Sequence, residues 1–138
     1  MNTKSKTISI AAIAAAVAVF NFQSCKKYDD GPAISLKSKK GRLTGEWELT
    51  GGDPGIYDPT ISQIWEFEKD GDFKWTYSYT GYSYSYQGDW EWENNKEEIE
   101  LTFTGGGISE FVIKRLTNKE LTIEGPSPYK YEWEFEKQ

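Results

Sequence analysis

Hydrophobic and polar residues alternate along the chain from Leu43 onward, with a period of two. In LTGEWEL, one side of the chain carries Leu43, Gly45, Trp47 and Leu49, and the other carries Thr44, Glu46 and Glu48. The same alternation recurs in ISQIWEFE, DFKWTYSY, YSYSYQGDWEW, IELTF, ISEFVIKRL, LTIE and YKYEWEFE. Strict alternation is typical of strands that bury one face. The pattern therefore predicts an antiparallel all-β domain over residues 42–138, without an amphipathic helix.

The first turn signal fixes which residues face each other across two strands. EKDGDF predicts a three-residue loop at residues 69–71, with its glycine in the left-handed conformation. This register places Phe67 opposite Phe73 and Trp65 opposite Trp75. A two-residue Asp-Gly turn would instead match Phe67 with a lysine, which is a worse match of faces.

The second turn signal, YTGY, predicts a type II turn in which Gly81 supplies the positive φ. It pairs Tyr79 with Tyr82, Tyr77 with Tyr84 and Trp75 with Tyr86. Further turns are predicted at ENNKEE and TNKE, and TGGG predicts a flexible connection. About eight strands in hairpin order favour an up-and-down barrel or a strongly curled sheet.

The first 25 residues differ from the rest of the chain. Lys4 and Lys6 precede an almost unbroken apolar run from residue 8 to 22, which is typical of a secretory signal. The segment FQSC then ends at Cys25, the only cysteine. This resembles the bacterial lipoprotein signal, whose lipobox is commonly Leu, small, small, Cys. Two alternatives stay open, an ordinary signal peptide with a stray cysteine and an N-terminal membrane anchor.

The lipoprotein interpretation divides the chain into three parts. Residues 1–24 would be the signal peptide, 25–41 a lipidated Cys25 with a flexible tether, and 42–138 the β domain. Two or three acyl chains such as palmitate on Cys25 would anchor the protein firmly, since stable attachment needs two chains. The predicted location is the cell envelope, on the outer membrane, facing either the periplasm or the cell surface.

Composition excludes several functions. The chain has 22 acidic and 16 basic residues without a basic stripe, which argues against nucleic acid as a partner. Histidine is absent, which removes the usual general base and the commonest zinc ligand. Asp70 and Asp72 flank Gly71 but lack the spaced ligands of a calcium loop, so a turn is predicted there. We expect no catalytic residue, metal or cofactor, and no enzyme activity.

Gly45 and Trp47, in GEW near the start of the first predicted strand, look like the Gly-X-Trp of lipocalins. The stretches GDWEWENNKEEIELTF and FVIKRLTNKELTI resemble the lipocalin-like domains of Gram-negative bacterial lipoproteins. The resemblance covers roughly residues 42–137 and implies a small up-and-down barrel that binds a ligand. Lipocalins often place an arginine from a late strand over that tryptophan. The last strand here has Lys130 but no arginine, and Arg115 lies earlier.

Aromatic residues make up 16% of the chain, and an eight-stranded barrel is only just wide enough for its own side chains or one small ligand. We therefore expect the rings to divide between a core and a mouth. The predicted core comprises Trp47, Trp65, Phe67, Phe73, Trp90, Phe103, Trp133 and Phe135. We expect Trp75 and Tyr86 to be buried, and Tyr79 and Tyr82 to be exposed at the hairpin tip, with Tyr77 and Tyr84 near the mouth.

The tyrosines admit two interpretations. Cross-strand ring pairs stabilise a hairpin by roughly 0.2–1 kcal/mol each without any ligand. Tyrosine with serine also makes a binding surface, because tyrosine offers contact area at low entropic cost. The predicted function is non-enzymatic binding of a small apolar or sugar-like ligand at the barrel mouth, through Tyr77, Tyr79, Tyr82 and Tyr84. The alternative is an interaction protein that docks an envelope partner through the Tyr/Ser-rich hairpin 75–92.

The lipid anchor can be tested at the single cysteine. Cys25 is the only residue able to accept the lipid, so Cys25→Ala should release the protein from membranes. In detergent phase partitioning, the wild type should enter the detergent phase and the variant should stay in the aqueous phase. Equal membrane retention of the two proteins would contradict the lipoprotein assignment.

Overall fold

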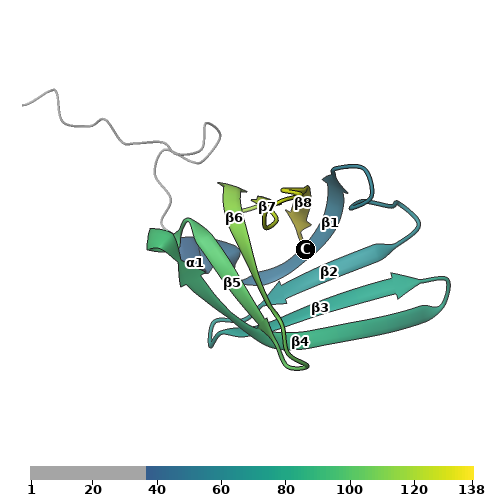
Figure 1. Ribbon diagram of the computed structural model, residues 1–138, viewed down its shortest axis with the longest axis horizontal. Helices are drawn as coiled ribbons and strands as arrows, with labels where there is room; N and C mark the ends of the chain where they lie inside the picture. Colours follow the sequence, from purple (N-terminus) through teal and green to yellow (C-terminus); the bar gives the residue numbers. More distant parts are fainter. Residues whose placement is uncertain (1–36) are drawn as a thin grey trace, which may run out of the picture.

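The computed structural model describes residues 37–138, so the predicted signal peptide, Cys25 and most of the predicted tether lie outside the described residues. The described part is a closed barrel of eight antiparallel strands, each paired with the next, with β8 pairing back to β1 (Figure 1). The strands are β1 (Gly45–Gly52), β2 (Ser62–Phe67), β3 (Asp72–Tyr79), β4 (Tyr82–Glu93), β5 (Glu98–Phe103), β6 (Ile108–Leu116), β7 (Glu120–Glu124) and β8 (Glu132–Lys137). The predicted fold class is confirmed. Across residues 37–138, no helix has the length and apolar character needed to cross a membrane.

Two short helices accompany the strands, α1 (Lys39–Leu43) and the 3-10 helix η1 (Asn94–Lys96). Ser38 caps α1, because its hydroxyl oxygen accepts a hydrogen bond of 3.0 Å from the backbone N–H of Gly41. The helix begins inside the segment that was expected to be a tether, and Leu43 belongs to it rather than to the first strand. Leu43 is fully buried, so the helix is held by inserting this side chain into the end of the barrel.

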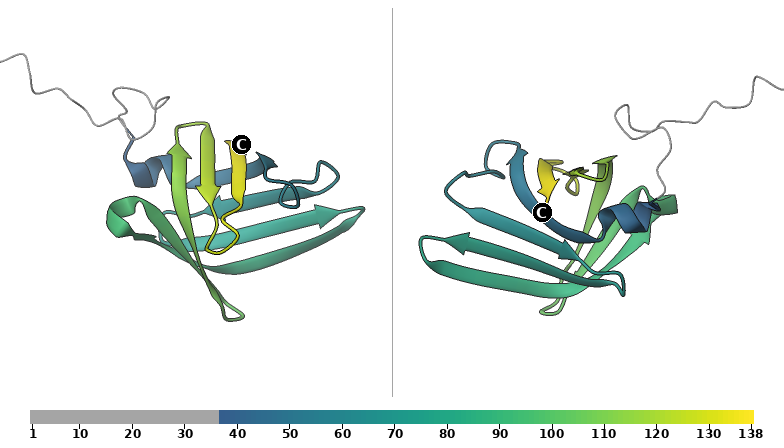
Figure 2. Two further views of the ribbon diagram at one scale, coloured as in Figure 1. Left: turned by 45° about the horizontal axis from the view of Figure 1, so that its top comes forward. Right: turned by 180° about the vertical axis from the view of Figure 1, so that it is seen from behind.

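The barrel has two different ends. One end, here called the α1 end, carries α1, the β2–β3 and β4–β5 connections and the last residues of β8. The other end, here called the mouth, carries the β1–β2, β3–β4, β5–β6 and β7–β8 connections. Figure 2 shows α1 beside the start of β1, while the β3–β4 hairpin projects at the opposite side of the molecule.

Trp47 closes the α1 end. It is fully buried, and its indole Nε1 donates a 2.6 Å hydrogen bond to the carbonyl oxygen of Leu43. The Nζ of Lys137 lies 4.7 Å from the centroid of the Trp47 ring. That ammonium also donates to the carbonyl oxygens of Arg42 and Thr44, both at 2.6 Å. One lysine therefore ties α1, the first strand and the last strand together.

The placement of Lys130 in the last strand, made from the sequence, is wrong. Lys130 lies in the loop before β8, at the mouth, whereas Lys137 is the final residue of β8 at the α1 end. Gly45 makes room for it, since a Cβ there would lie 2.8 Å from Lys137 Cε. Burial lowers the pKa of the Lys137 ammonium, and the charge of Lys37 lowers it further. Folding thus costs some hydration of this charge, which the two carbonyl groups offset.

The strand registers confirm the predicted residue pairs, but the type of the second turn differs from the prediction. Phe67 pairs with Phe73 and Trp65 with Trp75 across a loop whose Gly71 has φ 109°. The three predicted pairs of the β3–β4 hairpin are also present. Its turn is not type II, because Thr80 and Gly81 have φ values of 38° and 83°. Two positive values are typical of type I′, whose twist matches that of the strands it joins.

Aromatic rings fill the α1 half of the barrel. Of the eight predicted core aromatics, six are buried, while Phe103 and Trp133 are partly buried and pack against the core from the mouth side. Trp65 lies at the centre, with ring centroids 5.1 to 5.6 Å from those of Phe73, Trp75, Phe111 and Phe135. The buried residues described between residues 37 and 138 form one continuous core, so we expect this range to fold on its own.

The closing contact predicts a stability difference between two lysines. Lys137→Met should lower the free energy of unfolding by about 2 kcal/mol, because it removes two hydrogen bonds from a charged donor and leaves two carbonyl groups unpaired. Trp47→Ala should lower the free energy of unfolding by about 3–5 kcal/mol, as for other large buried rings. Lys114→Met is the control: its exposed ion pair with Glu124 is worth about 0–1 kcal/mol. Denaturant unfolding measures all three variants, and equal midpoints for the two lysine variants would mean that Lys137 does not hold the α1 end closed.

Candidate functional site

The large hydrophobic side chains that residues 37–138 expose all lie in the mouth connections or in the adjoining ends of the strands. They are Tyr57, Tyr79, Tyr82, Tyr84, Tyr86, Ile108, Tyr129 and Tyr131. Two of them, Tyr129 and Tyr131, stack with centroids 5.8 Å apart and planes 3° apart. Exposed apolar side chains gathered at one place mark a candidate interaction site, whereas scattered ones are ordinary.

The hairpin tyrosines agree in part with the prediction. Tyr79 and Tyr82 are 47% and 67% exposed, as expected. Tyr86 was expected to be buried and is 53% exposed, and Trp75 is only partly buried. The cause is the length of β5, which pairs with β4 only from Gly88 onward. Beyond that point no other strand between residues 37 and 138 covers the β4 side of the hairpin.

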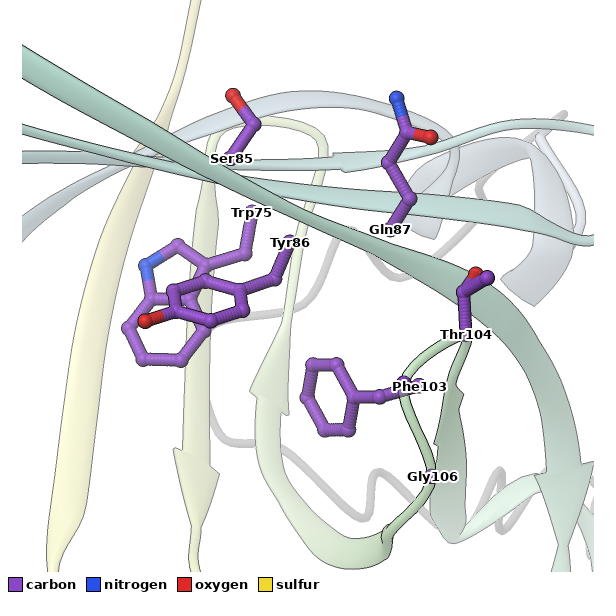
Figure 3. Close-up of a pocket in the computed structure, with 8 residues that line it drawn as sticks. Trp75, Ser85, Tyr86, Gln87, Phe103, Thr104 and Gly106 are labelled. Carbon is purple, nitrogen blue, oxygen red and sulfur yellow. The ribbon is translucent and has the colours of Figure 1, made fainter.

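Two pockets flank the contact between Trp75 and Tyr86, whose ring centroids are 5.3 Å apart. The first has a volume of about 590 Å³ and lies between β4 and the β5–β6 loop (Figure 3). Its lining is Trp75, Ser85, Tyr86, Gln87, Phe103, Thr104, Gly105 and Gly106. The second has a volume of about 390 Å³ and is lined by Gly55, Ile56, Gln63, Trp75, Tyr77, Tyr84, Tyr86 and Trp133. The barrel is thus packed at the α1 end and hollow at the mouth.

Neither lining contains a charged side chain. The polar groups are few and lie among rings. Gln63 is buried, and its Nε2 donates a long hydrogen bond of 3.4 Å to the carbonyl oxygen of Ile56. The indole Nε1 of Trp75 is buried without a partner among the described residues. Figure 3 shows this nitrogen and the Tyr86 hydroxyl on the same side of the ring pair. Ring faces with a few donors at their edges suit an uncharged ligand.

The four tyrosines predicted as a single site are divided by the structure. Tyr77 and Tyr84 line the second pocket. Tyr79 and Tyr82 instead line a separate hollow of about 500 Å³, between the hairpin tip and the β1–β2 loop. That hollow is also lined by the charged side chain of Glu48 and by residues of both connections and strand ends. The structure therefore favours Tyr77 and Tyr84 over Tyr79 and Tyr82 as pocket residues.

Sequence reasoning did not single out several pocket residues. In the alternating pattern Gln63 shares its face with Ile61 and Trp65, and a polar residue on such an inward face is a usable signal. Ile56 reaches the mouth from the β1–β2 loop, where no periodic pattern exists to predict its direction. Phe103 and Trp133 were assigned to the core. Both are partly buried, pack against the core from the mouth side, and each lines one of the two pockets.

A cluster of three acids lies at the α1 end, away from these pockets. Carboxylate oxygens of Glu68, Asp70 and Asp72 lie within 4.8 Å of one another, and all three residues are exposed. They surround the predicted turn, in which the backbone N–H of Glu68 donates to the carbonyl oxygen of Asp72 at 2.9 Å. The turn explains their proximity, since its two ends must meet.

Comparison with known proteins gives one family match. The sequence pattern of a family described as a lipocalin-like domain matches residues 43–123. The crystal structure of the lipoprotein YedD from Klebsiella pneumoniae is similar, with 17% identity, a TM-score of 0.48, and coverage of 78% of this chain and 76% of that chain. A protein from Shewanella oneidensis, provisionally named a lipoprotein, is 18% identical with a TM-score of 0.44, and the match covers 76% of this chain and 98% of that chain. No curated protein matches significantly.

The exposure of the hairpin tip predicts its contribution to stability. Changing Tyr79 and Tyr82 together to Ser should alter the free energy of unfolding by less than about 1 kcal/mol, because exposed rings contribute little to folding. Phe73→Ser, on the same hairpin but in the buried core, should cost several times more. Thermal unfolding compares the three proteins. If the double variant lost as much stability as Phe73→Ser does, the rings at the hairpin tip would have to be part of the core.

Proposed function

Because this chain belongs to the family of lipocalin-like domains, we propose that its barrel mouth binds a small uncharged ligand, apolar or sugar-like, in the two pockets beside Trp75 and Tyr86. The observation that carries the proposal is the pair of adjoining hollows, about 590 and 390 Å³, with aromatic walls and no charged lining residue. Volumes of this size are typical of small-molecule sites.

The lining favours a ligand with a flat face. The Tyr86 ring borders both pockets, and Tyr77, Tyr84 and Trp133 supply further ring surfaces in the second. Such faces bind either an apolar ring or the C–H face of a sugar. The amide of Gln63 and the tyrosine hydroxyls provide hydrogen bonds at the edges. A charged ligand is disfavoured, because burying its charge among these side chains would lack an opposite charge.

The type and burial of the polar side chains favour binding without catalysis. Among residues 37–138 the buried polar side chains are those of Gln63 and Thr117, and every carboxylate is at least partly exposed. The chain contains no histidine. The pocket linings therefore offer no group placed for general acid or base chemistry at neutral pH.

An anchor at Cys25 would orient this site. The described domain begins beside α1, at the end of the barrel opposite the mouth. A lipid on Cys25 would attach the domain through its α1 end, which leaves the mouth at the end of the barrel farther from the point of attachment. We therefore propose an outer-membrane lipoprotein of the cell envelope whose ligand arrives from the aqueous side.

The binding proposal can be tested with two tyrosine variants. Residues 37–138 would be titrated with N-phenyl-naphthylamine, an uncharged apolar dye, and with maltotetraose as an uncharged sugar, while tryptophan and dye fluorescence are recorded. Tyr86→Ala should weaken binding about tenfold, which corresponds to the loss of about 1.4 kcal/mol of ring contact.

Tyr129→Ala is the matched control, because Tyr129 is more exposed than Tyr86 and lines neither pocket. It should bind both probes as the wild type does. A wild type that binds neither probe, or equal weakening by both variants, would argue against a ligand site at the mouth.

A further inference from the structure

The outer half of β4 has one edge that no other strand of residues 37–138 covers. β3 pairs with β4 from Tyr82 to Asp89, but β5 pairs with β4 only from Gly88 onward. A Cβ at Gly88 would collide with the carbonyl oxygen of Thr102, so the two strands meet closely at this glycine. β5 ends at Phe103, opposite Gly88. Figure 1 shows β4 extending past the end of β5, where the chain turns into the connection to β6. The six residues 82–87 are all exposed.

The hydrogen bonds on either side of this segment show which backbone groups face the open edge. The N–H of Thr104 donates to the carbonyl oxygen of Gln87 at 2.8 Å, on the β5 side. The N–H of Trp90 donates to Gly71 at 2.7 Å, on the β3 side. Because these directions alternate along an antiparallel strand, the N–H and C=O groups of Ser83 and Ser85 point to the open edge. Those of Tyr82, Tyr84 and Tyr86 point to β3.

This edge lacks the features that normally protect a strand edge. Lysine, proline or an inward-pointing charge usually prevents an exposed edge from pairing with another chain. Residues 75–88 contain no charged residue and no proline, although the whole chain carries 38 charged residues. A row of free backbone donors and acceptors at strand spacing is complementary to one kind of partner, an extended polypeptide strand.

The sequence of the edge is symmetric about its centre, which identifies the partner strand. Residues 82–86 read YSYSY, the same in both directions from Tyr84. We propose that this edge pairs with the same edge of a second copy of the chain, around a two-fold axis at Tyr84. Ser83 then lies opposite Ser85 of the second copy, and both residues direct their backbone groups at each other. A two-fold interface requires this kind of self-complementary surface.

The same register pairs the rings. A two-fold axis perpendicular to the joined sheet keeps each face on its own side, so Tyr82 of one copy lies opposite Tyr86 of the other. Aromatic pairs across antiparallel strands add to the stability of the backbone pairing. The partner strand then also borders the 590 Å³ pocket, because Ser85, Tyr86 and Gln87 of this edge line it, and narrows the opening of that pocket. The antiparallel arrangement places the two barrels at opposite ends of the joined hairpins.

The two-fold axis makes a cross-linking test specific. Tyr84 faces itself in a pair without mutual hydrogen bonds, where the two Cα atoms are about 4.5 Å apart, within the range of a disulfide. In the full-length chain with Cys25→Ser, kept in detergent, Tyr84→Cys should form a disulfide-linked dimer on mild oxidation. Tyr82→Cys is the control, since Tyr82 faces Tyr86 and not itself. Cross-linking that is no stronger in Tyr84→Cys than in Tyr82→Cys would overturn the proposal.

A second pair of variants tests the backbone groups. In the Tyr84→Cys background, Ser85→Pro removes an N–H that faces the partner but not β3, so the hairpin should survive while the cross-link is lost. Ser85→Ala keeps that N–H and should keep the cross-link. Circular dichroism checks that the proline variant is folded; if it is not, the comparison of Tyr84→Cys with Tyr82→Cys decides alone. Equal cross-linking of folded proline and alanine variants would overturn the proposal. The dimer requires no ligand, so these outcomes are independent of the mouth's binding activity.

Discussion

Closure of the barrel between its first and last strands is the constraint on which the other features depend. β8 pairs with β1 so that Lys137 lies opposite Trp47. The ammonium group at the end of the last strand therefore lies over an aromatic ring near the start of the first strand. Once the sheet is closed, the inward side chains of eight strands share an interior that is only just wide enough for them. Rings fill that interior from the α1 end upward, and the aromatics that remain must lie at the mouth.

A mismatch in strand length then shapes the mouth. The β3–β4 hairpin continues for six residues after β5 has left it at Gly88. Its inner face, with Trp75 and Tyr86, becomes the wall of two pockets instead of core, and its outer edge keeps free backbone groups. The candidate ligand site and the candidate dimer edge are therefore two results of one local feature, the shortness of β5.

Much of the fold could be predicted because alternation and turn residues are local signals. The pairing of Phe67 with Phe73 followed directly from a three-residue loop ending in glycine. The burial of Tyr86 could not be predicted in this way, since alternation gives the face of a residue but not whether a neighbouring strand extends far enough to cover it. Lys137 was missed for a related reason: a lysine in an alternating strand is normally solvated, and only closure of the barrel brings it over Trp47. The pocket contribution of Ile56 depends on a loop that has no periodic pattern.

The proposed function depends on the entry of uncharged ligands into the mouth as far as Trp75. The indole N–H signals of the six tryptophans in a two-dimensional NMR spectrum of residues 37–138 test it most directly. On titration with maltotetraose or N-phenyl-naphthylamine, the signals of Trp75 and Trp133 should shift, while that of Trp47, hydrogen-bonded at the α1 end, should stay in place. Six unchanged signals with both compounds, or shifts confined to Trp47, would contradict a ligand site at the mouth.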